Sequence, residues 1–196
     1  MRTARSRDRY RRSLKNSMIA LFTVSCTLAV TSCSGASDDP KASPTPSAAQ
    51  PTTSADPTET AKKDAVATYQ AYWKEVAKLY ADRSGKSANL KKYAASAALK
   101  NVESDAKQAH DHNRIHIGKV TVGSPTVTDL DVKSKTPRAT LSSCLDISQW
   151  EVVDAKTKKP LSLPSNRLTK YVIKSEVERW PGGWRVIRDE PQGKRC

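Results

Sequence analysis

One segment of the chain, Ser34–Thr60, holds no residue that could build a hydrophobic core. It contains five Pro, five Ser, five Thr and five Ala, and it lacks aromatic residues, Val, Ile, Leu and Met. Such a composition cannot bury enough apolar surface to offset the entropy that a chain loses on folding. We therefore predict an extended spacer that reaches roughly 30 to 80 Å. Its Ser and Thr hydroxyls are also acceptors for glycosylation.

Ser34–Thr60 is the predicted linker, and the leader that precedes it has the order of segments found in an export signal. Residues 1–17 carry seven Lys or Arg against one acid, and a short apolar run, Met18–Val30, follows them. Small residues then lead into Cys33. A basic start, an apolar centre and a small-residue end are typical of a secretory signal. The apolar run is well short of the ~20 residues that a membrane-spanning helix needs, so we expect no permanent transmembrane helix.

Val30-Thr31-Ser32-Cys33 resembles the bacterial lipoprotein signal, in which a small aliphatic residue stands three places before the cysteine. The resemblance implies that Cys33 receives a diacylglyceryl group and that residues 1–32 are removed. Acyl chains such as palmitate would then hold the protein at the outer face of the plasma membrane, since two or more chains anchor durably where one is marginal. Residues 33–60 become the lipidated cysteine and its linker, and residues 61–196 the folded domain.

Three other interpretations of the leader fit less well. A plain secretory signal with an incidental cysteine would release the protein. Cys26 is a rival lipid acceptor, but Thr23 stands three places before it, and cleavage there would halve the apolar run. Arg11-Arg12 suggests the twin-arginine route, but the residues that follow lack its usual second apolar position. The export route is therefore left open.

The folded part is strongly basic. The whole chain carries +14; the leader accounts for +6 and the linker for −3, which leaves +11 for Ala61–Cys196. Nucleic acid is the usual partner of a basic protein, but an exported domain does not meet it and no basic–aromatic binding motif is present. Anionic lipid and wall polymer are the polyanions of a bacterial surface, and a merely solvated basic face is the alternative. The candidate contact residues are Lys156, Lys158, Lys159, Lys194 and Arg195.

Periodicity divides the domain into helices followed by strands. Apolar residues recur every three or four positions in Ala61–Asp82 and from Asn89 to about Ala109, which predicts two amphipathic helices. Alternating segments after Asn113 predict strands. The predicted strands are Ile115–Val122, Thr126–Val132, Ala139–Ile147, Leu168–Trp180 and Trp184–Asp189. Helices followed by antiparallel strands make an α+β domain.

The order of several short motifs carries a second resemblance. These motifs are Tyr69-x-x-Tyr72-Trp73, Lys92-Tyr93-Ala94, Cys144-Leu145-Asp146, Gly183-Trp184-Arg185-Val186 and the terminal cysteine. Together they are similar to the small secreted lipoproteins of high-GC Gram-positive bacteria. That resemblance implies a nuclear-transport-factor-2-like cone, in which N-terminal helices pack in a curved antiparallel sheet. It implies a fold more than a function, because one fold hosts many activities.

Two cysteines remain in the domain once Cys26 has left with the signal and Cys33 has been lipidated. We predict that Cys144 and Cys196 form a disulfide, because the compartment outside the membrane is oxidising. A closed loop of 52 residues is worth roughly 4 kcal/mol in the chain-entropy model. A free, reactive Cys144 is the alternative.

All three histidines of the chain, His110, His112 and His116, fall within seven residues. Imidazoles beside a carboxylate are ligands that zinc or copper prefers, so a metal site or polar pocket is one interpretation. The spacing matches no standard ligand motif, however. His110 near a helix C-terminus suits a cap that interacts with the helix dipole. We therefore expect a surface or capping role, with no metal and no cofactor.

Catalysis has little support in the sequence. Cone-fold enzymes such as ketosteroid isomerase use a pocket carboxylate of tuned pKa, sometimes with a tyrosine. Asp131, Asp146 and Tyr171 are the available residue types, but nothing in the sequence brings them together. No nucleophile elbow, phosphate loop or histidine–carboxylate pair at motif spacing is present. Asp146 shares a strand face with Cys144, which favours a structural polar side.

These observations predict a lipid-anchored binding or interaction module of the cell envelope that is not an enzyme. The alternatives are a cone that binds a small molecule or lipid and an isomerase or hydrolase that uses the cone cavity. A deep cavity with convergent polar groups would favour ligand binding or catalysis. A filled cone with an exposed apolar patch would favour an envelope protein partner.

Overall fold

The computed structural model describes residues 56–196, and the predicted signal, Cys33 and most of the predicted linker lie outside them. Three helices come first and four strands follow. The helices are α1 (Pro57–Ala81), α2 (Leu90–Tyr93) and α3 (Ser96–Asp111). The strands are β1 (Arg114–Asp131), β2 (Arg138–Asp154), β3 (Lys170–Trp180) and β4 (Gly183–Pro191). The predicted α+β class is confirmed.

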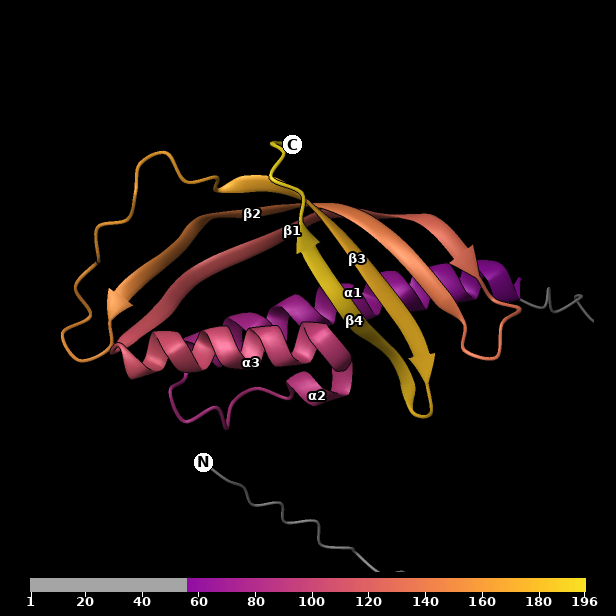
Figure 1. Cartoon of the computed structure of the whole chain (residues 1–196), viewed down its shortest axis with the longest axis horizontal. Helices are drawn as coiled ribbons and strands as arrows, with labels where there is room; N and C mark the ends of the chain where they lie inside the picture. Colours follow the sequence, from indigo (N-terminus) through magenta and orange to yellow (C-terminus); the bar gives the residue numbers. More distant parts are fainter. Residues whose placement is uncertain (1–55) are drawn as a thin grey trace, which may run out of the picture. The chain divides into compact units, whose positions relative to one another are not determined.

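The four strands form one antiparallel sheet in the order β1-β2-β3-β4. The sheet curls strongly, as a half-barrel does, and the helices pack against its concave face (Figure 1). The expected arrangement of helices in a curved antiparallel sheet is therefore present. No helix within residues 56–196 is long and apolar enough to cross a membrane.

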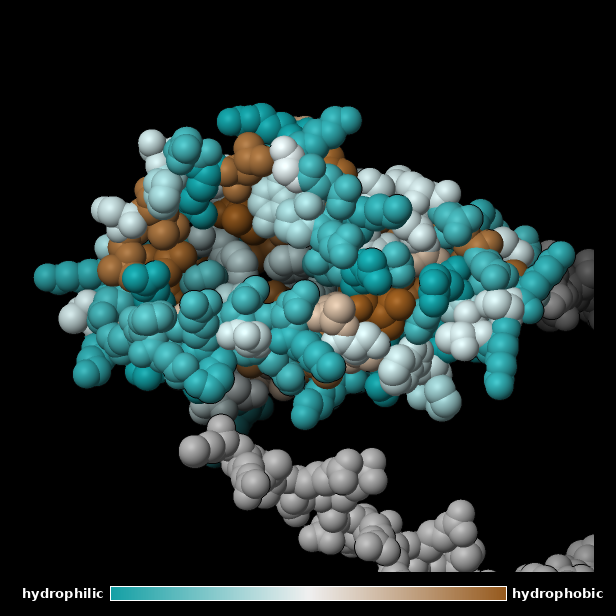
Figure 2. Space-filling view, viewed as in Figure 1, coloured by the Kyte–Doolittle hydropathy of each residue, from teal (hydrophilic) through white to brown (hydrophobic). Residues whose placement is uncertain are grey.

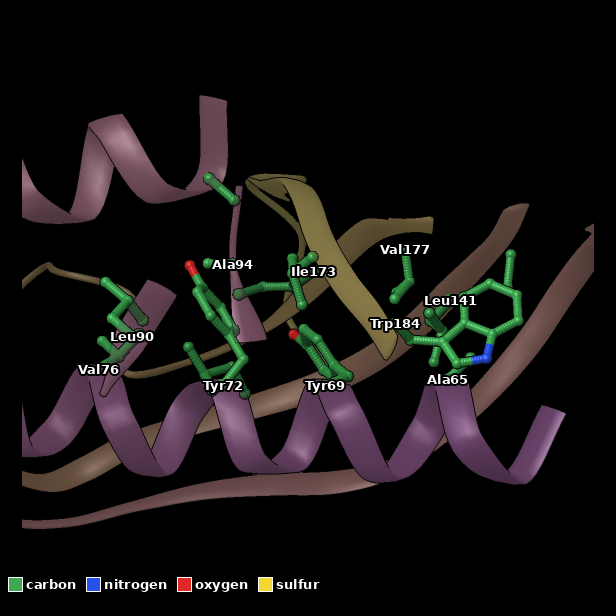
Figure 3. Close-up of a cluster of buried hydrophobic side chains, with 14 of the residues drawn as sticks. Ala65, Tyr69, Tyr72, Val76, Leu90, Ala94, Leu141, Ile173, Val177 and Trp184 are labelled. Carbon is green, nitrogen blue, oxygen red and sulfur yellow. The ribbon is translucent and has the colours of Figure 1, made fainter. Parts of the chain in front are cut away.

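The core forms where α1 meets the concave face of the sheet. Tyr69 and Tyr72 point from α1 toward Ile173 of β3, and Ala65 lies against Trp184 (Figure 3). The inner residues of β2 alternate as predicted, since Ala139, Leu141, Ser143 and Leu145 are buried while the residues between them are partly exposed. Period-2 alternation thus separates the concave face from the outer face.

Helix α1 begins at Pro57, four residues before the predicted start. Asp56 is the N-cap, and its carboxylate accepts a hydrogen bond of 2.9 Å from the Thr58 amide. Proline at the first helical position and an acid in the first turn, Glu59, are both favourable at a helix start. These capping residues lie inside the segment predicted as linker, so capping extends the helix beyond its apolar stripe.

The predicted second helix is two helices with a break at Ala94-Ala95. Ala94 forms a parallel bridge with Val186 of β4, and the Ala95 amide donates to the Val186 carbonyl over 2.9 Å. The chain therefore pairs with the edge of β4 before α3 begins. Apolar periodicity along the helices does not predict this pairing, because the pairing depends on a strand more than eighty residues away.

One long strand, β1, takes the place of the two predicted strands Ile115–Val122 and Thr126–Val132. The predicted turn, Gly123-Ser124-Pro125, is a register shift in the pairing with β2. Proline is tolerated there because β1 is an edge strand, where a missing amide breaks no ladder on the open side. Strand β2 also runs to Asp154, well past the predicted Ile147.

Candidate functional site

A cavity of about 310 Å³ lies between the concave face of the sheet and helices α1 and α3. Figure 2 shows the molecular surface hollowed between α3 and the sheet, with pale side chains inside the hollow. This volume stands at the lower end of the range for small-molecule sites, which is roughly 300 to 1,000 Å³. The cavity therefore suits a compact ligand.

Five aromatic rings line the cavity. They are Tyr72, Trp73 and Tyr80 of α1, Trp150 of β2 and Tyr171 of β3. Trp150 holds the cluster together, because its ring meets Trp73 edge-on at 6.5 Å between centroids and Tyr80 edge-on at 5.2 Å. Such edge-to-face pairs stabilise one arrangement of the rings. The aromatic wall is thus largely formed before any ligand arrives.

The carboxyl group of Asp189 on β4 also lines the cavity. The Asp189 residue is only partly buried, but its carboxyl group is enclosed by protein atoms. Its Oδ1 accepts a hydrogen bond of 2.6 Å from the buried Ser175 hydroxyl. Burial raises the pKa of Asp189 from 3.8 to about 7, although the hydrogen bond from Ser175 and the nearby Tyr69 hydroxyl act to lower that pKa.

A bulge in β4 directs Asp189 into the cavity. Trp184 and Val186 face inward, so strict alternation would place Arg188 inward next. The pairing of β3 with β4 shifts register between Glu176 and Val177, which inserts one extra residue into β4. Beyond that shift Asp189 and Pro191 line the cavity instead. A bulge that re-aims a side chain in this way is a recurrent feature beside functional sites.

The Tyr69 hydroxyl is bound to the aromatic wall and lies near Asp189. Trp73 Nε1 and the Ser143 hydroxyl each donate to Tyr69 Oη over 3.1 Å. Burial raises the pKa of Tyr69 well above its usual value, and the nearby Asp189 carboxyl acts in the same direction. Tyr69 therefore stays a neutral hydroxyl beside the acid, and the hydroxyl that donates to Asp189 is that of Ser175.

The cavity carries negative groups without a basic counterpart. Asn101 and Asp105 of α3, both exposed, stand at its rim. Within residues 56–196, no Lys or Arg lines it. None of the ion pairs formed by the described residues includes Asp189 or Asp105. The site thus combines an aromatic wall with unpaired acids.

The three residues considered for a catalytic pocket do not come together. Tyr171 lines the cavity, as a pocket residue would. Asp131 instead caps the β1–β2 turn, where it accepts hydrogen bonds from the amides of Lys133 and Ser134. Asp146 lies on the outer face, where it accepts from Ser148 and forms an ion pair of 3.1 Å with Lys170. Hydrogen bonds from Ser148 lower the pKa of Asp146 to about 2.

The three histidines occupy separate environments. His110 Nε2 lies 3.2 Å from the Tyr80 carbonyl oxygen, so it caps the last turn of α1 rather than its own helix. His112 is an exposed C-cap of α3. The His116 ring stacks on Tyr80 at 4.7 Å, and burial lowers the pKa of His116 to about 4. Among the described residues, no group of three or more His, Cys, Asp or Glu side chains is placed to hold a metal ion.

The outer face carries the cysteine pair. Cys144 and Cys196 lie at disulfide distance, with Cα atoms 5.9 Å apart. Val172 is the β3 partner of Cys144, and its amide donates to the Lys194 carbonyl over 2.8 Å. The chain after β4 therefore folds back along β3, and this return brings Cys196 beside Cys144.

The predicted basic contact residues are exposed, and the loop that holds three of them lies far from the start of α1. Lys156, Lys158 and Lys159 follow Asp154, whose carboxylate accepts a hydrogen bond of 2.6 Å from Asn113. Arg83, just past the end of α1, donates to the same Asn113. A helix of 25 residues is about 37 Å long. The basic loop thus stands at the opposite end of α1 from Asp56, the residue through which the chain continues toward Cys33.

A second hollow of about 500 Å³ lies between α1 and β1. It is larger but more open, and its lining residues include Gln70, Lys74 and Lys119. No acid, histidine or cysteine lines this hollow, and Trp73 is its one aromatic residue among the described residues. The smaller cavity therefore has the stronger claim to be the functional site.

Sequence reasoning missed Asp189, Trp150 and Tyr80 as members of one site. Asp189 lies in the run Arg188-Asp189-Glu190, which has the appearance of a solvated strand end. The register shift that turns Asp189 inward is a property of the paired strands and leaves no mark in a single sequence. The apolar spacing in Ala61–Asp82 is the one available signal, and it indicates a buried helix face without indicating a cavity beside it.

Comparisons with known proteins leave the family open. No protein-family model matches the chain, and no curated protein matches it. Among solved structures, the chain is similar to the intermembrane space region of the chloroplast protein ARC6. That likeness has 10% identity, covers 68% of this chain and 95% of that one, and has a TM-score of 0.44. A likeness this weak bears on neither fold family nor function.

Proposed function

We propose that this chain is an extracytoplasmic lipoprotein whose domain binds a small ligand in the aromatic cavity without transforming it. The observation that supports ligand binding most is the partly enclosed space between α1, α3 and the sheet, lined by five aromatic rings and Asp189. Apolar walls with a few convergent polar groups are typical of small-molecule sites. The anchor rests on the leader sequence, and the domain is proposed to be a nuclear-transport-factor-2-like cone.

The binding test uses a neutral probe. N-phenyl-1-naphthylamine fluoresces strongly in apolar cavities, and we expect the protein to bind it in a saturable way. Val102 of α3 lines the cavity, whereas Ser104 of the same helix is exposed. Val102→Phe should fill the space and weaken binding at least about tenfold, and Ser104→Phe should not. Equal binding by both variants would place the probe elsewhere and contradict the proposal.

The anchor is tested by matched cysteine variants. Cys33→Ser should release the protein to the medium or leave an unprocessed precursor in the membrane. Cys26→Ser is the control, because that cysteine leaves with the signal, and this variant should be processed and anchored normally. A Cys33→Ser protein that is cut and membrane-bound like the wild type would contradict lipid anchoring.

Surface charge supports a second association, with anionic lipid or wall polymer. The exposed Lys156, Lys158, Lys159, Lys194 and Arg195 form no ion pair among residues 56–196. The position of the Lys156–Lys159 loop, remote from Asp56, favours wall polymer over the membrane beneath the anchor. Residues 51–196 should co-sediment with anionic polymer, less with neutral polymer, and less again as salt rises and the screening length falls below ~8 Å. Sedimentation that ignores charge and salt would contradict this association.

Proton transfer is the second candidate function, and the raised pKa of Asp189 favours it. A carboxyl group with a pKa of about 7 near the Tyr69 hydroxyl resembles an acid–base pair that could move a proton next to a carbonyl. Conversion of a simple β,γ-unsaturated ketone to its conjugated isomer, followed by ultraviolet absorbance, tests this activity. Loss of the conversion in Asp189→Asn would support it, and a rate equal to that in buffer would exclude it for that substrate.

A protein partner in the envelope has less support. Ile117 and Leu163 are the large hydrophobic residues that the described chain exposes, and each is only about a third exposed (38% and 36%). Interaction faces usually show larger contiguous apolar patches. The cavity therefore outranks the surface as the basis of the proposed function.

A further inference from the structure

The cavity combines two features that rarely serve the same neutral ligand. Three elements supply aromatic rings to its wall: α1 with Trp73 and Tyr80, β2 with Trp150 and β3 with Tyr171. The only charged groups that line it, among the described residues, are the carboxyl groups of Asp189 and Asp105. Aromatic faces and carboxylates both attract cations, because each presents negative electrostatic potential.

The Asp189 carboxyl also lacks a positively charged partner among the described residues. A buried carboxylate normally has a cationic partner or accepts several hydrogen bonds. Asp189 accepts a hydrogen bond from the hydroxyl of Ser175, which is a neutral donor, and it forms no ion pair within residues 56–196. Because the group also lines an open space, a cation there could supply the missing charge.

We propose that the cavity binds an organic ammonium ion, with the cationic nitrogen beside Asp189 and the apolar body between the tryptophan and tyrosine rings. This inference rests on the proposed ligand-binding function and specifies the class of ligand. Asp105, exposed at the rim on α3, adds negative potential at the entrance and draws cations toward it. The modest volume of about 310 Å³ selects a compact ion rather than a long lipid.

Two probes of nearly equal shape test the charge alone. Choline carries a quaternary nitrogen, and 3,3-dimethylbutan-1-ol has a carbon at that position and no charge. The full chain in detergent is titrated with each, and binding is followed by calorimetry and by the fluorescence of Trp73 and Trp150, which line the cavity. We expect choline to bind at least about tenfold more tightly, as cation–π and carboxylate contacts in a partly dry site allow.

Two aspartate variants locate the charge. Asp189→Asn keeps the shape of the side chain and should remove most of the preference for choline while leaving affinity for the alcohol unchanged. Asp146→Asn is the matched control, because Asp146 lies on the outer face, where it pairs with Lys170. This control should keep the full preference.

Three results would overturn the inference: equal affinity for the two probes, an unchanged preference in Asp189→Asn, or no binding of choline at any accessible concentration. The neutral dye separates these failures from failure of the proposed function. If the dye binds and Val102→Phe blocks it, the cavity still binds ligands and only the ammonium class falls. If the dye also fails to bind, ligand binding itself falls.

Discussion

Two aspartates on opposite faces of the same sheet show how strongly the fold sets the chemistry of a side chain. Asp189 on the concave face lies in an aromatic cavity, and burial raises the pKa of its carboxyl to about 7. Asp146 on the outer face accepts hydrogen bonds from Ser148 and pairs with Lys170, and its pKa falls to about 2. The residue type is the same, and the difference comes from desolvation on one side and hydrogen bonding in water on the other.

The burial pattern indicates that residues on the concave face contribute most of the free energy of unfolding. Leu141 is fully buried against α1, and its neighbour Thr140 points to the outer face. Leu141→Ala should cost about 4 kcal/mol of unfolding free energy, because it leaves a cavity in a packed core. Thr140→Ala should change stability by less than about 0.5 kcal/mol. Urea denaturation measures both, and similar losses would break the contrast between the faces.

The outer face is expected to contribute mainly through its covalent link. Removing the Cys144–Cys196 bond with a double Cys→Ser change should cost about 4 kcal/mol, because the unfolded chain gains the freedom of a 52-residue loop. Thermal unfolding should show a melting temperature several degrees lower. An intact mass that lacks two hydrogens would establish the bond in the wild type. Free-thiol labelling of native Cys144 would contradict it.

Much of the concave face could be predicted from the sequence, because local periodicity encodes it. The alternation through Leu141 and Leu145 predicted the inner side of β2, and the three- and four-residue spacing of Tyr69, Tyr72 and Val76 predicted the buried side of α1. These patterns depend on one element at a time. They indicate which side faces inward without indicating what lies opposite.

The cavity could not be predicted, because it depends on pairings between distant residues. Asp189 turns inward through a register shift against β3, and Trp150 reaches Tyr80 only because β2 continues past Ile147. The break at Ala94-Ala95 likewise exists because that segment pairs with Val186. Each is a long-range contact with no local pattern, so sequence periodicity predicted the elements and missed the site between them.

The pH dependence of stability should distinguish the inner acid. The raised pKa means that the folded state holds its Asp189 proton between about pH 4 and 7 while the unfolded state releases it. Stability should therefore fall as pH rises through that window, by roughly 2 kcal/mol for a partly exposed residue. The facing groups Tyr69, Tyr72 and Tyr171 have raised pKa values and stay neutral throughout. Asp189→Asn should abolish the slope, and an unchanged slope would contradict this assignment.

Asp146 should show a smaller effect of opposite sign. Its pKa is lowered by hydrogen bonds from Ser148, so its contribution is present above about pH 4 and is lost as pH falls toward 2. Asp146→Asn should therefore cost a small amount of stability at pH 6, where the wild-type carboxylate is ionised, and less as pH falls toward 2, where the wild-type carboxyl is also protonated. Denaturation curves at pH 3 and pH 6 provide the comparison. A large loss at pH 6 would show that the outer face carries more electrostatic stabilisation than its exposure suggests.

The most direct test of the contrast between the two faces is a carbon-13 NMR titration of the aspartate side-chain carboxyl groups, with Asp189→Asn and Asp146→Asn used to assign the signals. The concave-face cavity predicts a midpoint near pH 7 for Asp189 and near pH 2 for Asp146 in the same sample. Addition of choline should then shift the Asp189 midpoint downward and leave Asp146 where it was, since a cation favours the ionised carboxylate beside it. An Asp189 midpoint near pH 4, the value of a solvated carboxyl, would contradict an enclosed acid in the cavity.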